Sequence, residues 1–287
     1  MGIQRRLGRE IHRAADKATA RLIRRGDRVV LWTPEELGFG NFLYLWLQAY
    51  LRQARGEDCL VLHRPPMDPW LALIPGARDR LTIDRTSVRL SDRRQFSWDY
   101  LYFDRGFTRD ELHRFIAEYL VGSPLLAADV ERSQADIVAV NIRRGDYYSI
   151  PSLRGKYGFD IRGYLEVALP KAVATGQRVD GIRVVSDGIE WCKLKLDDLL
   201  IRFAPQVEYF SASSPSEHFR AVATARTIVG TNSTFTYWAG FVSNVLYGEE
   251  SHVVMPDFFN RLRENGRPFA LDPSWDIVHE IPGGWDA

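Results

Sequence analysis

The sequence predicts an α/β protein made of two facing Rossmann-like units, because short apolar runs alternate along it with segments of helical periodicity. Residues 137–142, Ile-Val-Ala-Val-Asn-Ile, form the clearest apolar run. Such a run is typical of a strand buried on both faces of a parallel sheet. The length of 287 residues suits about two domains. We therefore expect a parallel sheet in each unit.

Residues 1–28 differ from the rest of the chain in charge. They carry nine basic and three acidic side chains, a net charge of +6, which leaves −5 for the remainder of a chain whose total is +1. Apolar residues recur there at three- and four-residue steps, which predicts a basic amphipathic helix. Such a helix can lie peripherally on an anionic membrane surface. The alternative is a solvated helix that docks on its own domain.

The first unit is predicted over residues 29–134. Its expected elements are strands at 29–32, 59–62 and 81–83 and helices at 41–55 and about 109–121. The stretch from 65 to 98 is otherwise irregular, with many Pro, Arg and Asp residues. A segment with a Gly-Ser-Pro turn, 121–134, is expected to link it to the second unit.

The second unit is predicted over residues 135–287 and has the more regular pattern. Its expected strands lie at 137–142, 182–186 and 227–230, and its expected helices lie at about 162–175, at about 189–196 and from near Phe235. Ser214-Pro215-Ser216-Glu217 predicts a further helix start, because it combines a capping box with Pro at the first helical position.

Composition excludes several classes of protein. The 45% of hydrophobic residues includes no apolar run near the roughly 20 residues that cross a bilayer. Basic and acidic side chains nearly balance at 38 and 37, so bulk charge does not favour a nucleic-acid partner. Two cysteines outside any Cys/His cluster predict neither a disulfide framework nor a metal site. Without a visible secretory signal, we expect a bacterial cytoplasmic protein, with peripheral contact at the inner membrane face through residues 1–28.

Polar and charged residues follow three predicted strands of the second unit. The first strand is followed by Arg143-Arg144-Gly145-Asp146, the second ends in Ser186-Asp187, and the third is followed by Thr231-Asn232-Ser233-Thr234. Ligands of open parallel sheets bind beyond the carboxyl ends of the strands. Guanidinium groups, hydroxyls and helix-start N–H groups suit a pyrophosphate, and a carboxylate suits a ribose or a base. This edge therefore predicts a nucleotide-sugar site.

Each of these segments also has a purely structural reading. Arg-Arg-Gly-Asp is compatible with a surface turn that contains a local ion pair. Asp187, Asn232 and Ser233 are all compatible with helix N-caps. The coincidence at three strand ends favours the binding site.

Three motifs resemble those of the α-1,2-fucosyltransferases, a glycosyltransferase family 11-like group within the wider α-1,2/α-1,6/protein O-fucosyltransferases. Residues 141–147, Asn-Ile-Arg-Arg-Gly-Asp-Tyr, resemble the family's His-x-Arg-Arg-Gly-Asp-Tyr. Residues 184–193 are similar to its second motif, and residues 231–239 to its third, usually Asn-Ser-Ser-Phe-Ser-Trp-Trp. Order and spacing agree from about 135 to 260.

The sequence departs from the family pattern in two places. Gly38-Phe39-Gly40-Asn41-Phe42 resembles the family's Gly-x-Gly-Asn-Gln loop, with Phe42 in place of Gln. The loop lets backbone approach the donor, or is a plain strand-to-helix turn. Asn141 replaces the His that helps to hold guanine in relatives, so either its amide takes that role or the donor preference differs.

The resemblance implies an inverting, metal-independent GT-B-type transferase that moves fucose from GDP-fucose to a hydroxyl of a glycan or glycolipid. It implies no cofactor and no metal, and the sequence has no Asp-x-Asp motif. Arg143 and Arg144 are the predicted catalytic cations. The expected donor-binding residues are Gly38, Gly40, Asn41, Asn141, Arg143, Arg144, Asp187, Asn232, Ser233 and Thr234.

The group that accepts the acceptor's proton is less well specified. Glu36, beside the glycine loop, is favoured, and Glu35 and Asp146 are the alternatives. Two other hypotheses stay open for the protein as a whole: a transferase with a different GDP- or UDP-sugar donor, and a non-catalytic protein that binds a nucleotide sugar or glycan.

Overall fold

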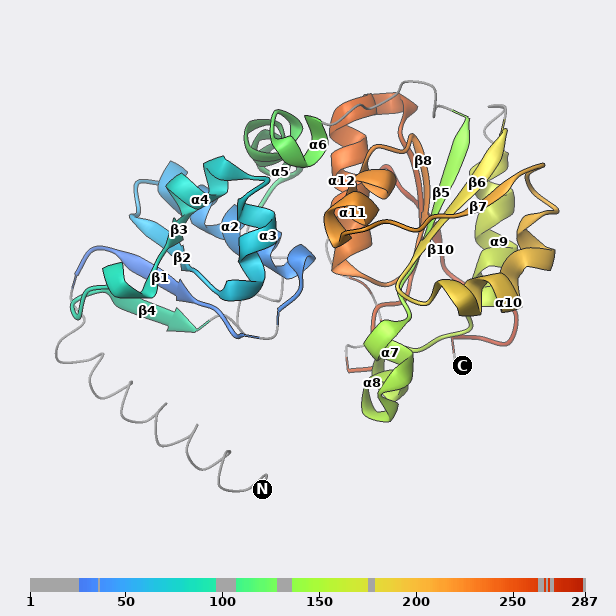
Figure 1. Ribbon diagram of the computed structural model, residues 1–287, viewed down its shortest axis with the longest axis horizontal. Coiled ribbons are helices and arrows are strands. Elements are labelled where there is room, and N and C mark those ends of the chain that lie inside the picture. The colour runs from blue at the N-terminus through green and yellow to red at the C-terminus, as the bar shows by residue number, and fades with distance from the viewer. Residues whose placement is uncertain are drawn as a thin grey trace. The chain divides into compact units, whose positions relative to one another are not determined.

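A computed structural model of the chain describes residues 26–35, 37–96, 107–127, 136–174, 179–262, 266, 268 and 271–285 (Figure 1). Two compact units divide the chain, unit 1 at 1–102 and unit 2 at 103–287. Each unit contains a sheet in which every strand pairing is parallel. The α/β class and the two parallel sheets of a GT-B-type fold, as predicted from the sequence, are confirmed.

Unit 1 is built on a four-stranded sheet of order β3-β2-β1-β4. Its strands are β1 (Val29–Trp32), β2 (Cys59–Leu62), β3 (Thr82–Ile83) and β4 (Arg93–Phe96). Its helices are α2 (Phe39–Ala54), η1 (Pro65–Met67), α3 (Asp68–Leu71), α4 (Pro75–Leu81) and η2 (Arg85–Ser87). The predicted strand at 59–62 is confirmed, whereas β4, whose sequence is Arg-Arg-Gln-Phe, lies in a stretch for which the sequence predicts irregular structure.

Helix α2 supplies much of the core of unit 1. It packs on β2, and its apolar residues Leu43, Trp46 and Leu47 are fully buried. Burying side chains of this size stabilises the unit by about 1.5–3 kcal/mol each. The helix begins directly after Gly38, so residues 39–42 of the predicted glycine loop form its first turn.

Unit 2 is built on a six-stranded sheet of order β10-β9-β8-β5-β6-β7. The strands are β5 (Ile137–Ile142), β6 (Gly181–Ser186), β7 (Val207–Tyr209), β8 (Thr227–Gly230), β9 (His252–Pro256) and β10 (Asp276–Val278). Strand β5 lies at the centre and is buried from Val138 onward. Its register pairs Ile142 with Ser186 and Asn141 with Gly230, so the ends of β5, β6 and β8 lie together.

Helices cover both faces of this sheet. Helices α9 (Ile161–Val173) and α10 (Ile189–Leu200) lie on one face, and α11 (Pro215–Ala223) and α12 (Thr234–Tyr247) lie on the other (Figure 1). The remaining helices are α5 (Arg109–Ile116), η4 (Ala117–Val121), α6 (Pro124–Ala127), α7 (Gly145–Ser149), α8 (Pro151–Tyr157) and η6 (Gly248–Glu250). Covered faces explain why the central strands β5 and β8 are buried and largely apolar.

The boundary between the units lies at 102/103, earlier than the predicted 134/135. The reason is that α5, η4 and α6 pack on α12 and α11. Phe115 of α5 meets Trp238 of α12 with ring centroids 5.8 Å apart, and Arg220 of α11 donates to the Leu125 carbonyl at 2.8 Å. Side chains from the expected first unit therefore complete the core of the second.

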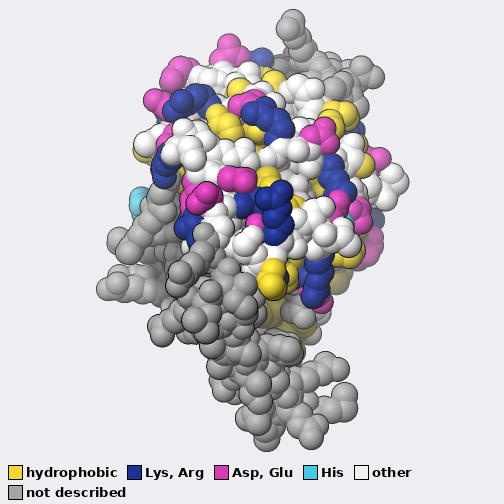
Figure 2. Space-filling model, turned by 90° about the vertical axis from the view of Figure 1, so that its left-hand side faces the viewer, with side chains coloured by type: hydrophobic (Ala, Val, Ile, Leu, Met, Phe, Trp, Pro, Cys, Tyr) yellow, Lys and Arg dark blue, Asp and Glu magenta, His cyan; other side chains and the backbone are white. Residues whose placement is uncertain are grey.

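Charge is mixed on the face of the molecule shown in Figure 2, where Lys and Arg side chains alternate with Asp and Glu. Among the described residues, no helix is long and apolar enough to cross a membrane. The predicted basic helix over residues 1–28 lies outside the described residues except for its last three positions.

Candidate functional site

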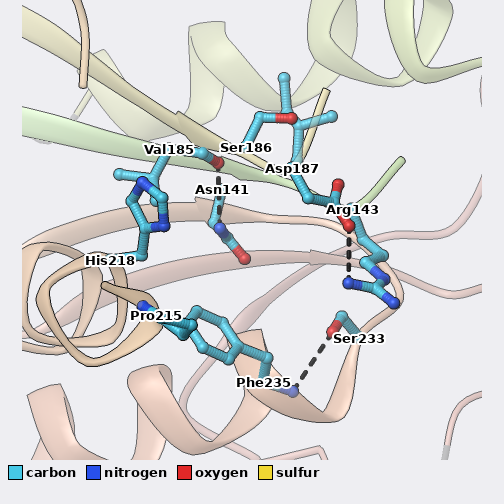
Figure 3. Close-up of a pocket in the computed structure, with 10 residues that line it drawn as sticks. Asn141, Arg143, Val185, Ser186, Asp187, Pro215, His218, Ser233 and Phe235 are labelled. Atoms are coloured by element: carbon cyan, nitrogen blue, oxygen red, sulfur yellow. Dashed lines mark hydrogen bonds and ion pairs between the residues drawn. The ribbon is translucent and has the colours of Figure 1, made fainter. Parts of the chain in front are cut away.

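A pocket of about 230 Å3 opens at the carboxyl ends of β5, β6 and β8 in unit 2 (Figure 3). Strands β5 and β6 and the residues that directly follow them contribute Asn141, Ile142, Arg143, Val185, Ser186 and Asp187. The N-terminal parts of α11 and α12 contribute Pro215, His218, Ser233 and Phe235. Pockets that enclose a drug-sized ligand measure roughly 300–1,000 Å3. This pocket therefore suits one part of a larger ligand, such as a nucleobase with an adjoining phosphate.

Arg143 is the cation of this pocket. Its backbone N–H donates to Oγ1 of Thr231 at 2.9 Å, which joins the end of β5 to the segment after β8. Its guanidinium donates to Asp187 Oδ2 at 2.6 Å and to Asp146 Oδ1 at 2.5 Å. About a third of the side chain is exposed, at 38%. The guanidinium is thus held in place by two carboxylates and still accessible to a ligand.

Arg144, the neighbouring predicted cation, points elsewhere. Its guanidinium carbon lies 4.0 Å from the ring centroid of Tyr148 and 3.8 Å from that of Trp191. Burial between these groups lowers the pKa of Arg144. Successive side chains at a strand end diverge to opposite faces. The structure therefore separates the two arginines, and Arg144 packs in a cation–π sandwich outside the pocket.

Asp187 holds the arginine segment through both of its oxygens. Oδ1 accepts the backbone N–H of Arg144 at 2.6 Å, and Oδ2 accepts from the Arg143 guanidinium. A Cβ added at Gly145 would clash with the same carboxylate. Glycine at that position is therefore required by the close approach of Asp187 rather than by backbone conformation.

Asn141 lies in the pocket wall and is 6% exposed. Its amide nitrogen donates to the Val185 carbonyl at 3.0 Å, and its carbonyl accepts from the Thr236 hydroxyl at 2.5 Å. An Asn side chain has two N–H donors, so one is left for a ligand. The main role visible for Asn141 is to tie β5 to β6 and α12.

The segment after β8 builds the start of α12. Ser233 is the N-cap of this helix, and its hydroxyl accepts from the Phe235 N–H at 3.2 Å. Thr234 is the first helical residue. The N-terminus of a 14-residue helix is a favourable place for an anion, because the helix dipole is positive there. Ser233 and Thr234 are therefore placed where a phosphate can bind.

Asn232, which is predicted to bind the donor, is buried and makes hydrogen bonds within unit 2. It is 1% exposed, and its amide nitrogen donates to the carbonyls of Tyr157 and Phe259 at 2.9 and 2.7 Å. This places the aromatic pair Tyr147 and Tyr157, stacked at 4.3 Å, beside the arginine segment. Arg143 lies 5.3 Å from the Tyr147 ring.

His218, Pro215 and Phe235 were not predicted as site residues. The ring of His218 contacts Phe210 edge-on at a centroid distance of 5.9 Å. The capping box at residues 214–217 could have indicated the pocket residues of α11, because it marks the start of this helix and the helix begins beside the pocket. Ser214 accepts from the Glu217 N–H at 3.3 Å, as that pattern predicts.

The predicted residues of the glycine loop belong to unit 1. Gly38 is the N-cap of α2, and its carbonyl accepts the Asn41 N–H at 3.0 Å. Gly40 is buried in the first turn. A Cβ at Gly38 would meet open space, and its φ of −87° does not require glycine. Glu36 lies outside the described residues.

The described residues contain no cluster of three or more His, Cys, Asp or Glu side chains placed to hold a metal ion. Glu35 is 78% exposed and lies 3.3 Å from Arg64. The polar groups that the structure does bring together are therefore those around Arg143: two carboxylates, the Thr231 hydroxyl and the start of α12.

The family model of glycosyl transferase family 11 matches residues 97–258, which is more than half of the chain. The protein belongs to glycosyl transferase family 11. It is a fucosyltransferase-like glycosyltransferase, and the matched region contains all the unit 2 residues of the pocket. Membership in this family implies a nucleotide-sugar donor and a glycan acceptor.

Two solved structures resemble this family 11 protein. A crystal structure of POFUT1 in complex with GDP gives a TM-score of 0.39 at 12% identity and covers 80% of this chain and 98% of that chain. The E. coli heptosyltransferase WaaC with ADP gives a TM-score of 0.40 at 12% identity, over 90% of this chain and 92% of that chain. No curated protein sequence matches the chain.

Proposed function

We propose that the protein is an inverting, metal-independent fucosyltransferase that moves fucose from GDP-fucose to a hydroxyl of a glycan or glycolipid. Family membership supports the glycosyltransferase class. The observation that carries the rest is the placement of Arg143 in one pocket with Ser233, the N-cap of α12. A guanidinium and a helix N-terminus at one pocket are the groups that a diphosphate needs.

The diphosphate would bind between Arg143 and the first turn of α12. As the bond to the sugar breaks, negative charge grows on the departing nucleoside diphosphate. Arg143, the Thr234 N–H and the hydroxyls of Ser233 and Thr234 would stabilise that charge, a role that divalent cations take in other transferases. Asp146 and Asp187 hold the guanidinium at 2.5 and 2.6 Å, so it is oriented before the donor arrives. Such preorganisation lowers the cost of reorganisation during the reaction.

The nucleobase would lie against the wall formed by His218, Phe235 and Val185. These side chains line the pocket, and His218 and Val185 lie next to Asn141 (Figure 3). Aromatic side chains offer stacking surfaces for a heteroaromatic ring. The remaining amide N–H of Asn141 and the imidazole of His218 would supply the polar contacts that select the base.

A general base is needed to take the acceptor's proton in an inverting transfer. Asp146 is the candidate in unit 2, where its carboxylate is 44% exposed beside Arg143. Glu36 of unit 1 remains the other candidate. If the transition state is largely dissociative, the demand on this base is small.

A different nucleotide-sugar donor is the second candidate function. The specific observation that favours it is the fixed amide of Asn141, which is engaged with Val185 and Thr236 where relatives have His. The site would then keep its contacts to the phosphates but bind a different base or sugar.

A donor panel separates these functions. Hydrolysis and transfer would be measured with GDP-fucose, GDP-mannose and UDP-sugars, together with the shift in melting temperature that GDP produces. We expect turnover with GDP-fucose and stabilisation by GDP, because a ligand that binds only the folded state raises its stability. Turnover with another donor alone would select the second function. Stabilisation by GDP without any turnover would indicate a non-catalytic binding protein. The absence of both turnover and stabilisation would refute the nucleotide-sugar site.

Peripheral membrane contact through residues 1–28 is part of the same proposal. Its support is the net charge of +6 in that segment. Sedimentation with anionic vesicles, compared with neutral vesicles, tests it. Equal sedimentation with both would contradict an electrostatic contact.

A further inference from the structure

A group of arginines surrounds Trp32 at the carboxyl edge of the sheet in unit 1. The guanidinium carbons of Arg64, Arg85 and Arg94 lie 6.0, 5.7 and 4.7 Å from the centroid of the Trp32 ring. Trp32 is the last residue of β1, Arg64 follows β2 and Arg85 follows β3. Three cations from three parts of unit 1 thus converge on one side chain at a sheet edge where ligands bind.

Arg64 is buried, with 9% of its surface exposed. Its Nε and Nη2 donate to the carbonyl of Thr33 at 3.0 and 2.6 Å, and Nη1 lies 3.3 Å from Glu35. A guanidinium has five N–H donors, so two have no partner among the described residues. Burial lowers the pKa of Arg64, and the charge of Arg85 lowers it further.

Few carboxylates among the described residues pair with Arg64 and Arg85. The only carboxylate paired with Arg64 in the described part of the chain belongs to Glu35, which is 78% exposed. Arg85 is exposed and has no ion pair among the described residues. Like charges that converge with little compensation raise the energy of the free protein. Binding an anion would lower it.

We propose that Arg64 and Arg85, gathered around Trp32, bind an anionic group carried by a sugar, either a carboxylate or a phosphate. Guanidinium groups match both through paired N–H bonds. The site lies in unit 1, apart from the pocket at Arg143. Given the proposed function, on which this step rests, the anionic group belongs to the acceptor, so the enzyme acts on acidic glycans.

The test begins with binding of simple probes to the full-length protein. Glucuronate, glucose 6-phosphate and glucose are titrated while the Nε–H signals of the arginines are followed by NMR. We expect the charged probes to bind about tenfold or more tightly than glucose, the effect of charge-assisted hydrogen bonds. Binding of glucuronate alone assigns a carboxylate, and binding of glucose 6-phosphate alone assigns a phosphate. Equal binding of all three probes, or of none, overturns the proposal.

Variants locate the binding. Arg85→Gln should weaken the charged probes about tenfold and leave glucose unchanged. Arg93→Gln is the matched control, because Arg93 lies on β4 next to Arg94, is 50% exposed and pairs with Glu57 at 3.0 Å. The titrations are repeated in an Arg143→Ala background, which removes the cation of the other pocket. Unchanged binding in Arg85→Gln, or its loss in the Arg143→Ala background, contradicts the proposal.

Transfer assays then separate this site from the proposed function. With acidic and neutral acceptor oligosaccharides of equal length, Arg85→Gln should raise the KM of the acidic acceptor and leave that of the neutral one unchanged. If the probes bind as expected but no donor is turned over, the anion site stands and the proposed function fails. If transfer occurs without any preference for the acidic acceptor, the function stands and the acceptor assignment fails.

Discussion

The carboxyl edges of the two sheets both display arginines, but they differ in how those charges are balanced. In unit 2, Arg143 is paired with two carboxylates at 2.5 and 2.6 Å. In unit 1, Arg64 is buried with a single exposed carboxylate at 3.3 Å. The first arrangement fixes a guanidinium in one orientation, and the second keeps positive charge available. The difference shows that a count of arginines at a strand end does not describe a site, whereas the partners of each guanidinium do.

The largest effect is expected from removal of the fixed cation. Arg143→Ala should lose roughly 3 kcal/mol or more of transition-state stabilisation, about a hundredfold in kcat, because it removes a contact to the leaving phosphate. The matched control is Arg183→Ala, since Arg183 on β6 pairs with Glu208 at 2.7 Å away from the pocket. Steady-state kinetics with the active donor measure both. Wild-type rates in Arg143→Ala would contradict the assignment of Arg143 as the cation that contacts the leaving phosphate.

Gly145→Ala tests whether Asp187 must stay in place. The added methyl group clashes with the carboxylate that holds Arg143, so we expect kcat to fall by about tenfold or more as the guanidinium loses its orientation. Gly155→Ala is the control, because a Cβ there meets nothing and the position lies within α8. That control should be stabilising by about 0.5–1 kcal/mol. Equal kinetics in the two variants would show that Asp187 is not needed to orient Arg143.

Arg144→Ala distinguishes the two adjacent arginines. The variant loses two cation–π contacts, so we expect the free energy of unfolding to fall by about 1–3 kcal/mol. The donor KM should change little, since Arg144 does not line the pocket. Urea unfolding measures the first quantity, with the exposed Arg202→Ala as the control. An unchanged stability together with a large loss of kcat would assign Arg144 to the reaction instead.

The smallest effects compare the two threonines that hold these arginines. Thr231→Val removes the acceptor of the Arg143 backbone N–H and should cost about 1–2 kcal/mol. Thr33→Val should cost at least as much, because the buried Thr33 hydroxyl donates to the Leu62 carbonyl and accepts from Nε of Arg64, both at 3.1 Å. Urea unfolding curves of the two variants measure both losses. An unchanged free energy of unfolding in either variant would show that its hydroxyl does not help to hold the arginine.

Much of the fold could be predicted where the local signal is strong. The apolar runs at 137–142 and 227–230 correspond to β5 and β8 residue for residue. Strand β4 was missed because Arg93-Arg94-Gln95 has no apolar alternation, and β7 because it has three residues. The structure divides the chain at 102/103, and the sequence does not indicate this position, since only tertiary contact joins α5 to α12.

The sequence predicted which residues lie at the site but not which hydrogen-bond partners they have. Sequence order identified the residues at three strand ends, and the structure brings Arg143, Asp187 and Ser233 to one pocket. Sequence gave no sign that Asn141 is engaged by Thr236, 95 residues away, or that Asn232 serves Tyr157 and Phe259. Such partners depend on the packing of helices against the sheet, which residue types alone do not specify.

The parallel pairing of the strands in the described part of the chain has a consequence for how the protein is made. A parallel pair cannot grow from a tight hairpin, so each pairing waits for an intervening crossover, and nucleation is slow and exposed to aggregation. In unit 2 the central strand β5 is synthesised well before β8, which directly precedes the third motif. A nascent chain that has reached residue 226 already holds Arg143 and Asp187 but lacks Ser233. Ligand would therefore assist maturation only at a late stage, and slow, chaperone-supported expression should yield more native enzyme than dilution from denaturant.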